Sequence, residues 1–439
     1  MDELSRAASL AADPAPHRAR FPFIARQFPP FTPRQWRVFG ISTTAGFFDF
    51  YDAALLSLAL KQIQQGLGIA EARLGGMMSA IRMGYVASLA ISPLADVFGR
   101  RRLLLYTIIG YTLFTALSAI APHQGSFVAA QFMTRAFSGA EATVSLVILV
   151  EEVDAAVRGW ALGMQGALAI SGFGLAAIVF STIAIIPFGW RGLYALALAP
   201  LVLIIPIRRI LPESRRFESE RAAGLTPNNP LEPLMGLLRA YPGRFAIVVT
   251  VLFFYFMGSA TANFFVPKFL QEMHHWTPGR VSSLYVFGGA IGILGNVVAG
   301  RTSDRFGRRR MGAIYMALGS GLALCLYTGG IYSAGMGVVA LWVTMLFCDQ
   351  ATQTLMNTYG AELFPTSQRA AALGAIKVMG YVGGSMGLLL EGVLYGVARS
   401  HWGAIRLLTA PWLAAAVAMY ILFPETAGQE LEAIAPEAR

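Results

Sequence analysis

The sequence predicts an all-α polytopic membrane protein with twelve transmembrane helices arranged as two six-helix halves. The first observation is composition: 56% of the 439 residues are hydrophobic and only 13% are charged, whereas a soluble domain has about a quarter of its residues charged. The second is that apolar runs of about 20 residues recur along the chain, and each is long enough to cross a bilayer core. The third is a loop motif that occurs twice.

Twelve spans are expected in order along the chain. The first six lie at about 36–60, 76–98, 103–121, 126–150, 160–185 and 190–210, and the second six at about 245–268, 281–300, 311–331, 336–362, 370–397 and 403–423. The chain therefore divides into a tail (1–35), an N-terminal half (36–210), a polar linker (211–244), a C-terminal half (245–423) and a second tail (424–439).

The distribution of charge predicts orientation. The net charge is +10, and the arginines gather in alternate loops, including 100–102, 208–221 and 301–310. Under the positive-inside rule these loops face the cytoplasm, next to the bilayer surface. We therefore expect a bacterial cytoplasmic (inner) membrane, both termini cytoplasmic and no nucleic-acid partner. The polar first 20 residues have no apolar core, so they do not predict a cleaved signal peptide.

An internal repeat supports the division into halves. PLADVFGRRRL (93–103) aligns with RTSDRFGRRRM (301–311), and each copy follows the second span of its half. Asp96 matches Asp304, Gly99 matches Gly307, and the three arginines of each copy match. Parallel repeats of six spans are one known transporter architecture.

These motifs resemble those of the major facilitator superfamily. D-x-F-G-R-R-R is similar to its loop signature, and RGWALG (158–163), PESRRF (212–217), ELFPTSQR (362–369) and PETAGQELE (424–432) resemble span-end signatures of sugar porters and related symporters. GAE (139–141) resembles a motif of metabolite:proton and phosphate:proton symporters. The resemblance implies a set of gating residues: Asp96, Arg100, Arg101, Glu151, Arg158, Asp304, Arg308, Arg309, Glu362 and Arg369.

Asp49 and Asp52, in FFDFYDAALL (47–56), are the most informative residues. Three residues apart on a helix, they share nearly one face, and an ionised Asp at this depth costs about 2.5–3.5 kcal/mol on insertion scales. A buried carboxyl can exchange a proton near neutral pH, and two on one face can share a proton. Proton coupling or substrate contact is one interpretation; pairing with a buried arginine is the other.

Other buried charges lie in the N-terminal half. Arg135, near the depth of the two aspartates, is expected either to bind a substrate carboxylate bidentately or to neutralise an Asp. The resemblance implies proton coupling for Glu141, although the family arginine normally occurs at the position of Gln131, one turn before Arg135. For Arg82 we favour a structural role.

The C-terminal half offers a weaker polar stripe. Asp349, Gln350, Gln353 and Asn357 lie at helical spacing, and we expect them to contact substrate or to bond between helices. Asn263 and Lys377 are further substrate-binding candidates, and Glu391 is expected at the rim. The two cysteines, Cys325 and Cys348, predict neither a disulfide framework nor a metal site.

The sequence therefore predicts a secondary transporter that uses the proton gradient and needs no cofactor. Symport of a small organic anion, a carboxylate or aromatic acid, is the favoured hypothesis, working as a monomer. A proton-coupled sugar or polyol transporter and a drug:proton antiporter are alternatives. A non-transporting sensor belongs to a different class, and no nucleophile or metal constellation indicates an enzyme.

Overall fold

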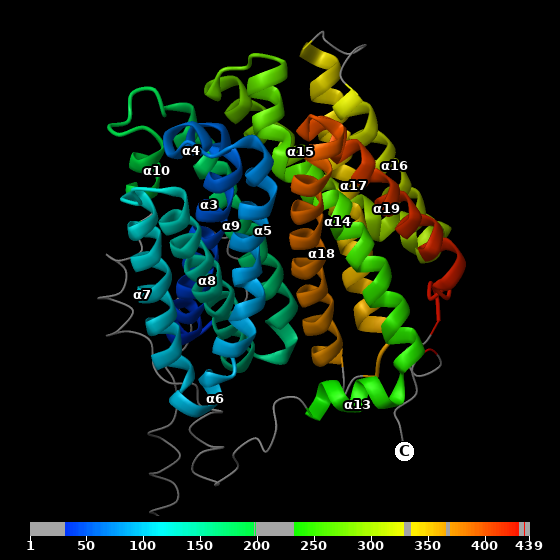
Figure 1. Cartoon of the computed structure of the whole chain (residues 1–439). Helices are drawn as coiled ribbons and strands as arrows, with labels where there is room; N and C mark the ends of the chain where they lie inside the picture. The colour runs from blue at the N-terminus through cyan, green and yellow to red at the C-terminus, as the bar shows by residue number, and fades with distance from the viewer. Residues whose placement is uncertain are drawn as a thin grey trace, which may run out of the picture.

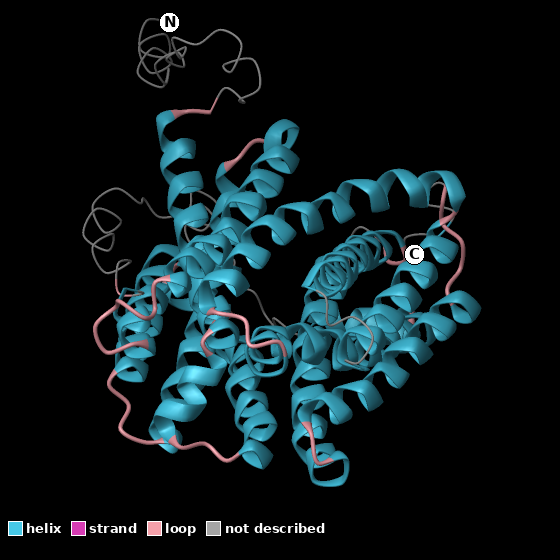
Figure 2. Cartoon of the chain, turned by 90° about the horizontal axis from the view of Figure 1, so that it is seen from above, coloured by secondary structure: helices cyan, strands magenta, loops and turns pink. Residues whose placement is uncertain are grey.

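The computed structural model describes residues 31–196, 198, 232–328, 335–365, 369–429 and 434, and the elements in these ranges are helices joined by short loops (Figure 2). In the N-terminal half they are α3 (Pro33–Leu58), α4 (Leu60–Leu67), α5 (Glu71–Ile91), α6 (Leu94–Phe98), α7 (Arg100–Ala119), α8 (Gln124–Glu152), α9 (Ala155–Ser181) and α10 (Trp190–Leu196). In the C-terminal half they are α13 (Glu232–Ala240), α14 (Pro242–Met273), α15 (Pro278–Phe306), α16 (Arg308–Thr328), α17 (Gly335–Glu362), α18 (Arg369–Ala398) and α19 (His401–Leu422).

Ten of these helices are long and apolar enough to span a membrane within the described ranges. They agree with ten of the twelve expected spans, apart from differences at their ends. Helix α3, the first expected span, is not among the ten. Its sequence includes the charged residues Arg34, Arg37, Asp49 and Asp52. The sixth expected span is described only at 190–196 and 198, so most of it lies outside the described residues, as do the tail 1–30 and linker residues 211–231. Within the expected linker, 232–240 forms α13.

Local sequence explains several helix ends. Helix α3 begins with a capping box, in which Thr32 Oγ1 accepts from the Gln35 N–H and Gln35 Oε1 accepts from the Thr32 N–H. The repeated loops share a backbone feature: Gly99 precedes α7 with φ 96°, and Gly307 precedes α16 with the same φ of 96°. Glycine adopts this conformation at little cost. The sequence repeat is therefore also a repeat of backbone geometry.

The two halves stand side by side, with α3–α10 on one side and α14–α19 on the other (Figure 1). Within the N-terminal half α3 packs on α9, and α8 packs on both α5 and α7. The main contacts between halves are α5 with α18 and α9 with α15. In each of these pairs the second long helix of one half meets the fifth of the other, as a two-fold relation between halves requires.

We call the end of the bundle that carries Arg100–Arg102 and Arg308–Arg310 the arginine-rich end, and the opposite end, where α4 lies, the distal end (Figure 1). The hydrogen bonds and ion pairs that join the halves among described residues start at Ser57, Leu58, Lys61, Gln62, Glu71 and Ser79 of the N-terminal half. These residues belong to the end of α3, to α4 and to the first turns of α5. The halves are thus bonded together at the distal end.

Close backbone approach makes this distal contact tight. A Cβ placed on Gly75 of α5 would lie 2.4 Å from the Leu388 carbonyl oxygen and 2.7 Å from the Gly392 nitrogen of α18. These distances are shorter than any van der Waals contact, and the atoms are backbone atoms that cannot rotate away. Glycine at position 75 therefore sets how closely the two halves approach each other.

Candidate functional site

A buried ion pair lies at the centre of the N-terminal half. Asp52 Oδ2 of α3 is 2.8 Å from Arg135 Nη2 of α8, and both side chains are 2% exposed. The same Nη2 donates to the Asp52 carbonyl oxygen at 3.2 Å and to Gln131 Oε1 at 3.2 Å. Of the two roles that the sequence leaves open for Arg135, the structure supports neutralisation of an Asp in this conformation.

Tyr85 of α5 connects this pair to the other half. Arg135 Nη1 donates to the Tyr85 hydroxyl at 3.3 Å, and the guanidinium lies 5.7 Å from the Tyr85 ring centroid. The Tyr85 ring stacks on Tyr381 of α18, with centroids 4.7 Å apart and planes 13° from parallel. The Asp52–Arg135 pair is therefore connected through Tyr85 to Tyr381, which lies in the other half.

Two further carboxyl groups lie beside the pair. Asp49 interacts electrostatically with Arg135, and Glu141 with Asp49. Asp49 Oδ1 and both carboxyl oxygens of Glu141 are buried and have no hydrogen-bond partner among the described residues. An ionised carboxyl held this way loses its hydration without compensation. These groups are therefore suited to carry a proton.

Arg82, for which the sequence favours a structural role, lies on the same face of α5 as Tyr85. Its guanidinium lies against Gly384 of α18, because a Cβ on that glycine would be 2.6 Å from Arg82 Nε. Its Nε is buried without a hydrogen-bond partner among the described residues. Arg82 is therefore a cation at the interface between the halves with an unused donor, which its position in the sequence does not reveal.

The polar stripe of the C-terminal half is saturated at its buried end. Asp349 Oδ1 accepts from the Tyr255 hydroxyl at 2.6 Å, and Asp349 Oδ2 accepts from Gln353 Nε2 at 2.9 Å. Asn263 donates to the Ser259 carbonyl oxygen one turn before it. The remaining candidates, Gln350, Asn357 and Lys377, are half-buried, exposed and exposed, respectively. None of the bonds of these residues connects the stripe to the central acids.

The arginine-rich end contains two matched ion pairs. Arg100 Nη2 of α7 lies 3.3 Å from Glu151 Oε1 of α8, and Arg308 Nη1 of α16 lies 2.9 Å from Glu362 Oε2 of α17. Each pair joins the third long helix of its half to the fourth. Arg308 also contacts Asp304, whose side chain is largely exposed. The side chains of Asp96, Arg158 and Arg369 lie outside the described residues.

The sequence did not single out Glu425, from the PETAG motif, as a site residue. Its carboxylate accepts from the N–H groups of Arg308, Arg309, Thr426 and Ala427, so it caps the start of α16. Burial works against the ionised form, but the four N–H donors outweigh burial and hold the pKa of Glu425 below its ordinary value. The PETAG motif therefore holds the start of α16 next to the second copy of the repeated loop.

One expectation at the distal end is wrong, and one charged residue there was not considered as a site residue. Lys268 lies inside α14, which continues to Met273, and has no exposed side-chain surface. Glu391, expected at the rim, is fully buried and contacts His401. Both belong to a cluster between the halves that a single-segment reading of the sequence does not reveal, because its members come from four helices.

The helical bundle, its apolar spans and its buried charges define an integral, multi-pass membrane protein of the transporter type. The model of the Major Facilitator Superfamily matches residues 43–388 and 293–434, and the chain belongs to that family. It is 26% identical to the 4-hydroxybenzoate transporter PcaK of Pseudomonas aeruginosa, over 89% of this chain and 92% of that protein. It is 25% identical to a gallate transporter of Pseudomonas putida, again over 89% and 92%.

A solved structure supports the same fold. A D-xylose-proton symporter superposes with a TM-score of 0.73 over 90% of this chain and 99% of that chain, at 20% identity. At that identity the likeness establishes the fold and carries no information on the substrate.

Proposed function

We propose that this protein is a proton-coupled symporter of a small aromatic carboxylate that works by alternating access. The observation that carries the proposal is the central cluster: Asp52 pairs with Arg135, Asp49 interacts electrostatically with Arg135, and Glu141 interacts with Asp49. In a low-dielectric interior one cation offsets one carboxylate, and further ionised carboxyls raise the electrostatic cost steeply. The cluster is therefore built to hold and exchange protons.

Coupling follows from competition for Arg135. While Asp52 is ionised, its Oδ2 occupies the Arg135 guanidinium at 2.8 Å. A proton on Asp52 removes that charge and leaves Arg135 free for another anion. A substrate carboxylate then binds best to the protonated site, and by reciprocity the proton binds best when the substrate is present. Symport requires this relation between the two ligands.

The substrate class is inferred from the groups beside the cluster. Arg82 has a buried donor without a partner, and Tyr85 and Tyr381 present a stacked aromatic pair next to it. A guanidinium binds a carboxylate, and aromatic rings favour an aromatic body. The names of the two relatives, which refer to hydroxylated benzoates, support the same class.

The remaining parts of the proposal concern orientation and gating. The arginine-rich end would face the cytoplasm of a bacterial inner membrane under the positive-inside rule. The Arg100–Glu151 and Arg308–Glu362 pairs would clasp neighbouring helices in one access state and loosen in the other. The architecture has both halves on one chain, so we propose that a monomer is the transporting unit.

The test is internal acidification of proteoliposomes that contain a pH-sensitive dye. 4-Hydroxybenzoate, gallate, inorganic phosphate and D-xylose are added in turn to wild-type protein and to two variants. Asp49→Asn removes a central acid without breaking the Asp52–Arg135 ion pair. Asp154→Asn is the matched control, because Asp154 is exposed and makes no side-chain capping bond at the start of α9.

We expect the aromatic acids, and neither phosphate nor D-xylose, to acidify liposomes that contain wild type or Asp154→Asn. Asp49→Asn should bind substrate but give no substrate-driven acidification. Acidification by D-xylose alone would show that the substrate is a neutral sugar and not an aromatic carboxylate. Acidification by Asp49→Asn at the wild-type rate would remove Asp49 from the coupling step.

A further inference from the structure

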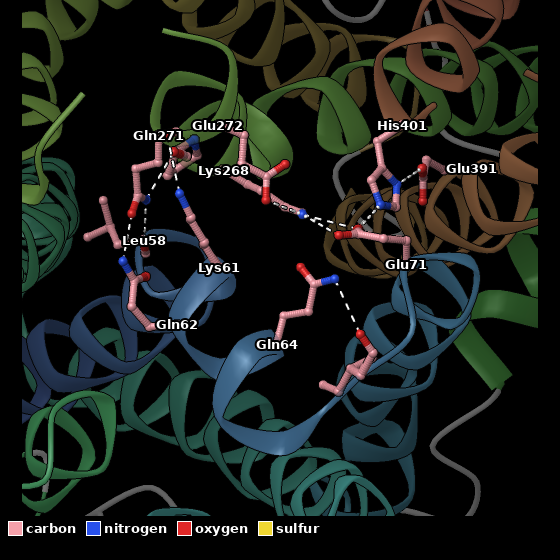
Figure 3. Close-up of polar contacts among 12 residues, drawn as sticks. Leu58, Lys61, Gln62, Gln64, Glu71, Lys268, Gln271, Glu272, Glu391 and His401 are labelled. Atoms are coloured by element: carbon pink, nitrogen blue, oxygen red, sulfur yellow. Dashed lines mark hydrogen bonds and ion pairs between the residues drawn. The ribbon is translucent and has the colours of Figure 1, made fainter. Parts of the chain in front are cut away.

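A second cluster of charged residues lies at the distal end, where the two halves meet (Figure 3). Glu71, at the start of α5, is the member from the N-terminal half. Lys268 and Glu272 of α14, Glu391 of α18 and His401 of α19 belong to the C-terminal half. We call these five residues the distal cluster. Lys268 and Glu391 have no exposed side-chain surface, and His401 is 4% exposed.

His401 bridges the halves through both ring nitrogens. Its Nε2 lies 2.6 Å from Glu71 Oε2, and its Nδ1 contacts Glu391 Oε1 (Figure 3). An ionised carboxylate only accepts hydrogen bonds, and a neutral imidazole has a single N–H. Both contacts can be hydrogen bonds only if an additional proton is present, either on the imidazole or on one of the carboxyls. The bridge therefore contains one proton more than a neutral histidine between two carboxylates.

Charge counting leads to the same conclusion. Lys268 Nζ lies 3.1 Å from Glu71 Oε2 and 2.6 Å from Glu272 Oε1, so one ammonium faces two carboxylates. With Glu391 ionised and His401 neutral, the cluster would have two unbalanced negative charges in a largely buried place. A proton on the bridge halves that excess, which lowers the electrostatic cost of burial.

Among the described residues, the ion pairs of His401 are those with Glu71 and Glu391, and its other neighbours are mainly uncharged. Tyr395 of α18 lies beside the imidazole, with ring centroids 4.6 Å apart, and Phe265 of α14 stacks on it at 5.3 Å. Tyr327 of α16 interacts electrostatically with Glu391. Lys61 of α4 donates to the Gln271 carbonyl oxygen, and Gln64 lies near Glu71. These groups leave the bridge dependent on a proton for its balance.

We propose that the distal cluster is a second proton-binding site, which takes up a proton when the halves close at the distal end. Glu71 is the only member of the cluster from its half, so opening removes one acceptor from His401 and one carboxylate from Lys268. The closed form then binds the proton more tightly than the open form. By linkage, lowering the pH favours closure and raising it favours opening. This device operates independently of proton coupling at Asp49, Asp52 and Glu141.

The experiment measures closure directly. Spin labels are placed at Gln65 of α4 and Met273 of α14, which are exposed residues at the distal end of opposite halves. The background is the full chain with Cys325→Ser and Cys348→Ala, reconstituted in nanodiscs without substrate. Pulsed electron–electron distance measurements then give the ratio of closed to open molecules across the pH range in which imidazole titrates, about pH 5–8.

We expect the closed-to-open ratio to rise as the pH falls, by up to about tenfold per pH unit for one linked proton. His401→Gln should make the ratio independent of pH. Glu71→Gln should do the same and favour the open form; because Glu71 is partly exposed at a helix start, this variant also serves if His401→Gln does not fold. His274→Gln is the matched control: His274 is a distal histidine that contacts the Phe269 ring, and it should keep the wild-type profile.

Three results would overturn the proposal: a wild-type ratio that does not change with pH, closure favoured by alkaline pH, or a wild-type profile in His401→Gln. The same titration in an Asp49→Asn background separates the two proposals. If the closed-to-open ratio of that variant still depends on pH, the proposal of a distal proton site stands, whatever the outcome of the symport test. A profile lost only in that background would assign the linked proton to the central cluster and overturn the distal site.

Discussion

Glu141 and Asp349 are buried acids in corresponding places, each on the fourth long helix of its half, yet their surroundings are opposite. Neither oxygen of Glu141 has a hydrogen-bond partner among the described residues. Both oxygens of Asp349 accept, one from Tyr255 and one from Gln353. The repeat therefore duplicated a scaffold and not a chemistry: at these matched positions the acid of the N-terminal half lacks hydrogen-bond partners, and the acid of the C-terminal half has them.

The largest expected effect is the loss of protein stability when the ion pair of the central cluster is broken. Arg135→Met leaves Asp52 buried without its cation, so we expect a loss of about 3–5 kcal/mol, as for other broken buried pairs. Asp52→Asn in the same molecule should recover most of it. Thermal unfolding in detergent of both single variants and of the double variant forms a complete cycle. Additive losses would mean that the two residues do not act as a pair.

The next prediction sets the two halves against each other in transport. Asp349→Asn keeps an acceptor for Tyr255, and we expect gradient-driven uptake within about twofold of wild type, because both oxygens of Asp349 already accept from Tyr255 and Gln353. Asp49→Asn should abolish uptake in the same assay. Radiolabelled substrate in energised vesicles provides the measurement. Equal losses of uptake in the two variants would mean that Asp349 is as important for transport as Asp49.

A smaller effect is expected when the C-terminal acid loses one donor. Tyr255→Phe removes the hydroxyl that lies 2.6 Å from Asp349 Oδ1, and a buried acceptor left without its donor costs about 1–3 kcal/mol. The melting temperature should fall while uptake persists. Tyr315→Phe is a suitable control, because in the described part of the chain its hydroxyl bonds to Thr302, away from Asp349. A selective loss of uptake in Tyr255→Phe would make this site functional.

The smallest effect concerns the cap on α16. Because the pKa of Glu425 is lower in the folded protein than in the unfolded chain, its contribution is complete above the unfolded value of about 4.3 and is lost as the pH falls through the folded value. Glu425→Gln should therefore lower the melting temperature at pH 7, by the equivalent of about 0.5–1 kcal/mol for a lost cap. The two proteins should converge in acid.

Asp304→Asn is the control for the cap, since Asp304 at the end of α15 is largely exposed and its ion pair with Arg308 contributes little. A constant difference between wild type and Glu425→Gln down to pH 3 would contradict a role for the charge of Glu425.

Much of the fold could be predicted from the sequence because hydropathy and charge act locally. Long apolar runs give the spans, and the copies at 93–103 and 301–311 give the repeat, which reappears as the shared φ of Gly99 and Gly307. The depth of Asp49, Asp52 and Arg135 also follows from counting residues along helices. Pairing of an aspartate with Arg135 was one of two interpretations that the sequence left open, and the structure shows the Asp52–Arg135 pair.

The distal cluster could not be predicted in this way. Glu71, Lys268, Glu391 and His401 are far apart in the chain and come together only when α5, α14, α18 and α19 pack. Each alone looks like an ordinary charge near the end of a span, as Glu391 did. The unused Nε donor of Arg82 could not be predicted for a similar reason, because only the packed structure shows which residues surround it.

A substitution at Gly75 would separate the two halves at the distal end. Its hydrogen atoms face the backbone of α18 at a distance that leaves no room for a methyl group. Gly75→Ala should therefore act as a conformational trap, which holds the distal end apart without touching the central acids or the clasps at the other end. A trapped molecule of this kind is the starting material for a structure of the opposite access state and for selecting antibodies against it.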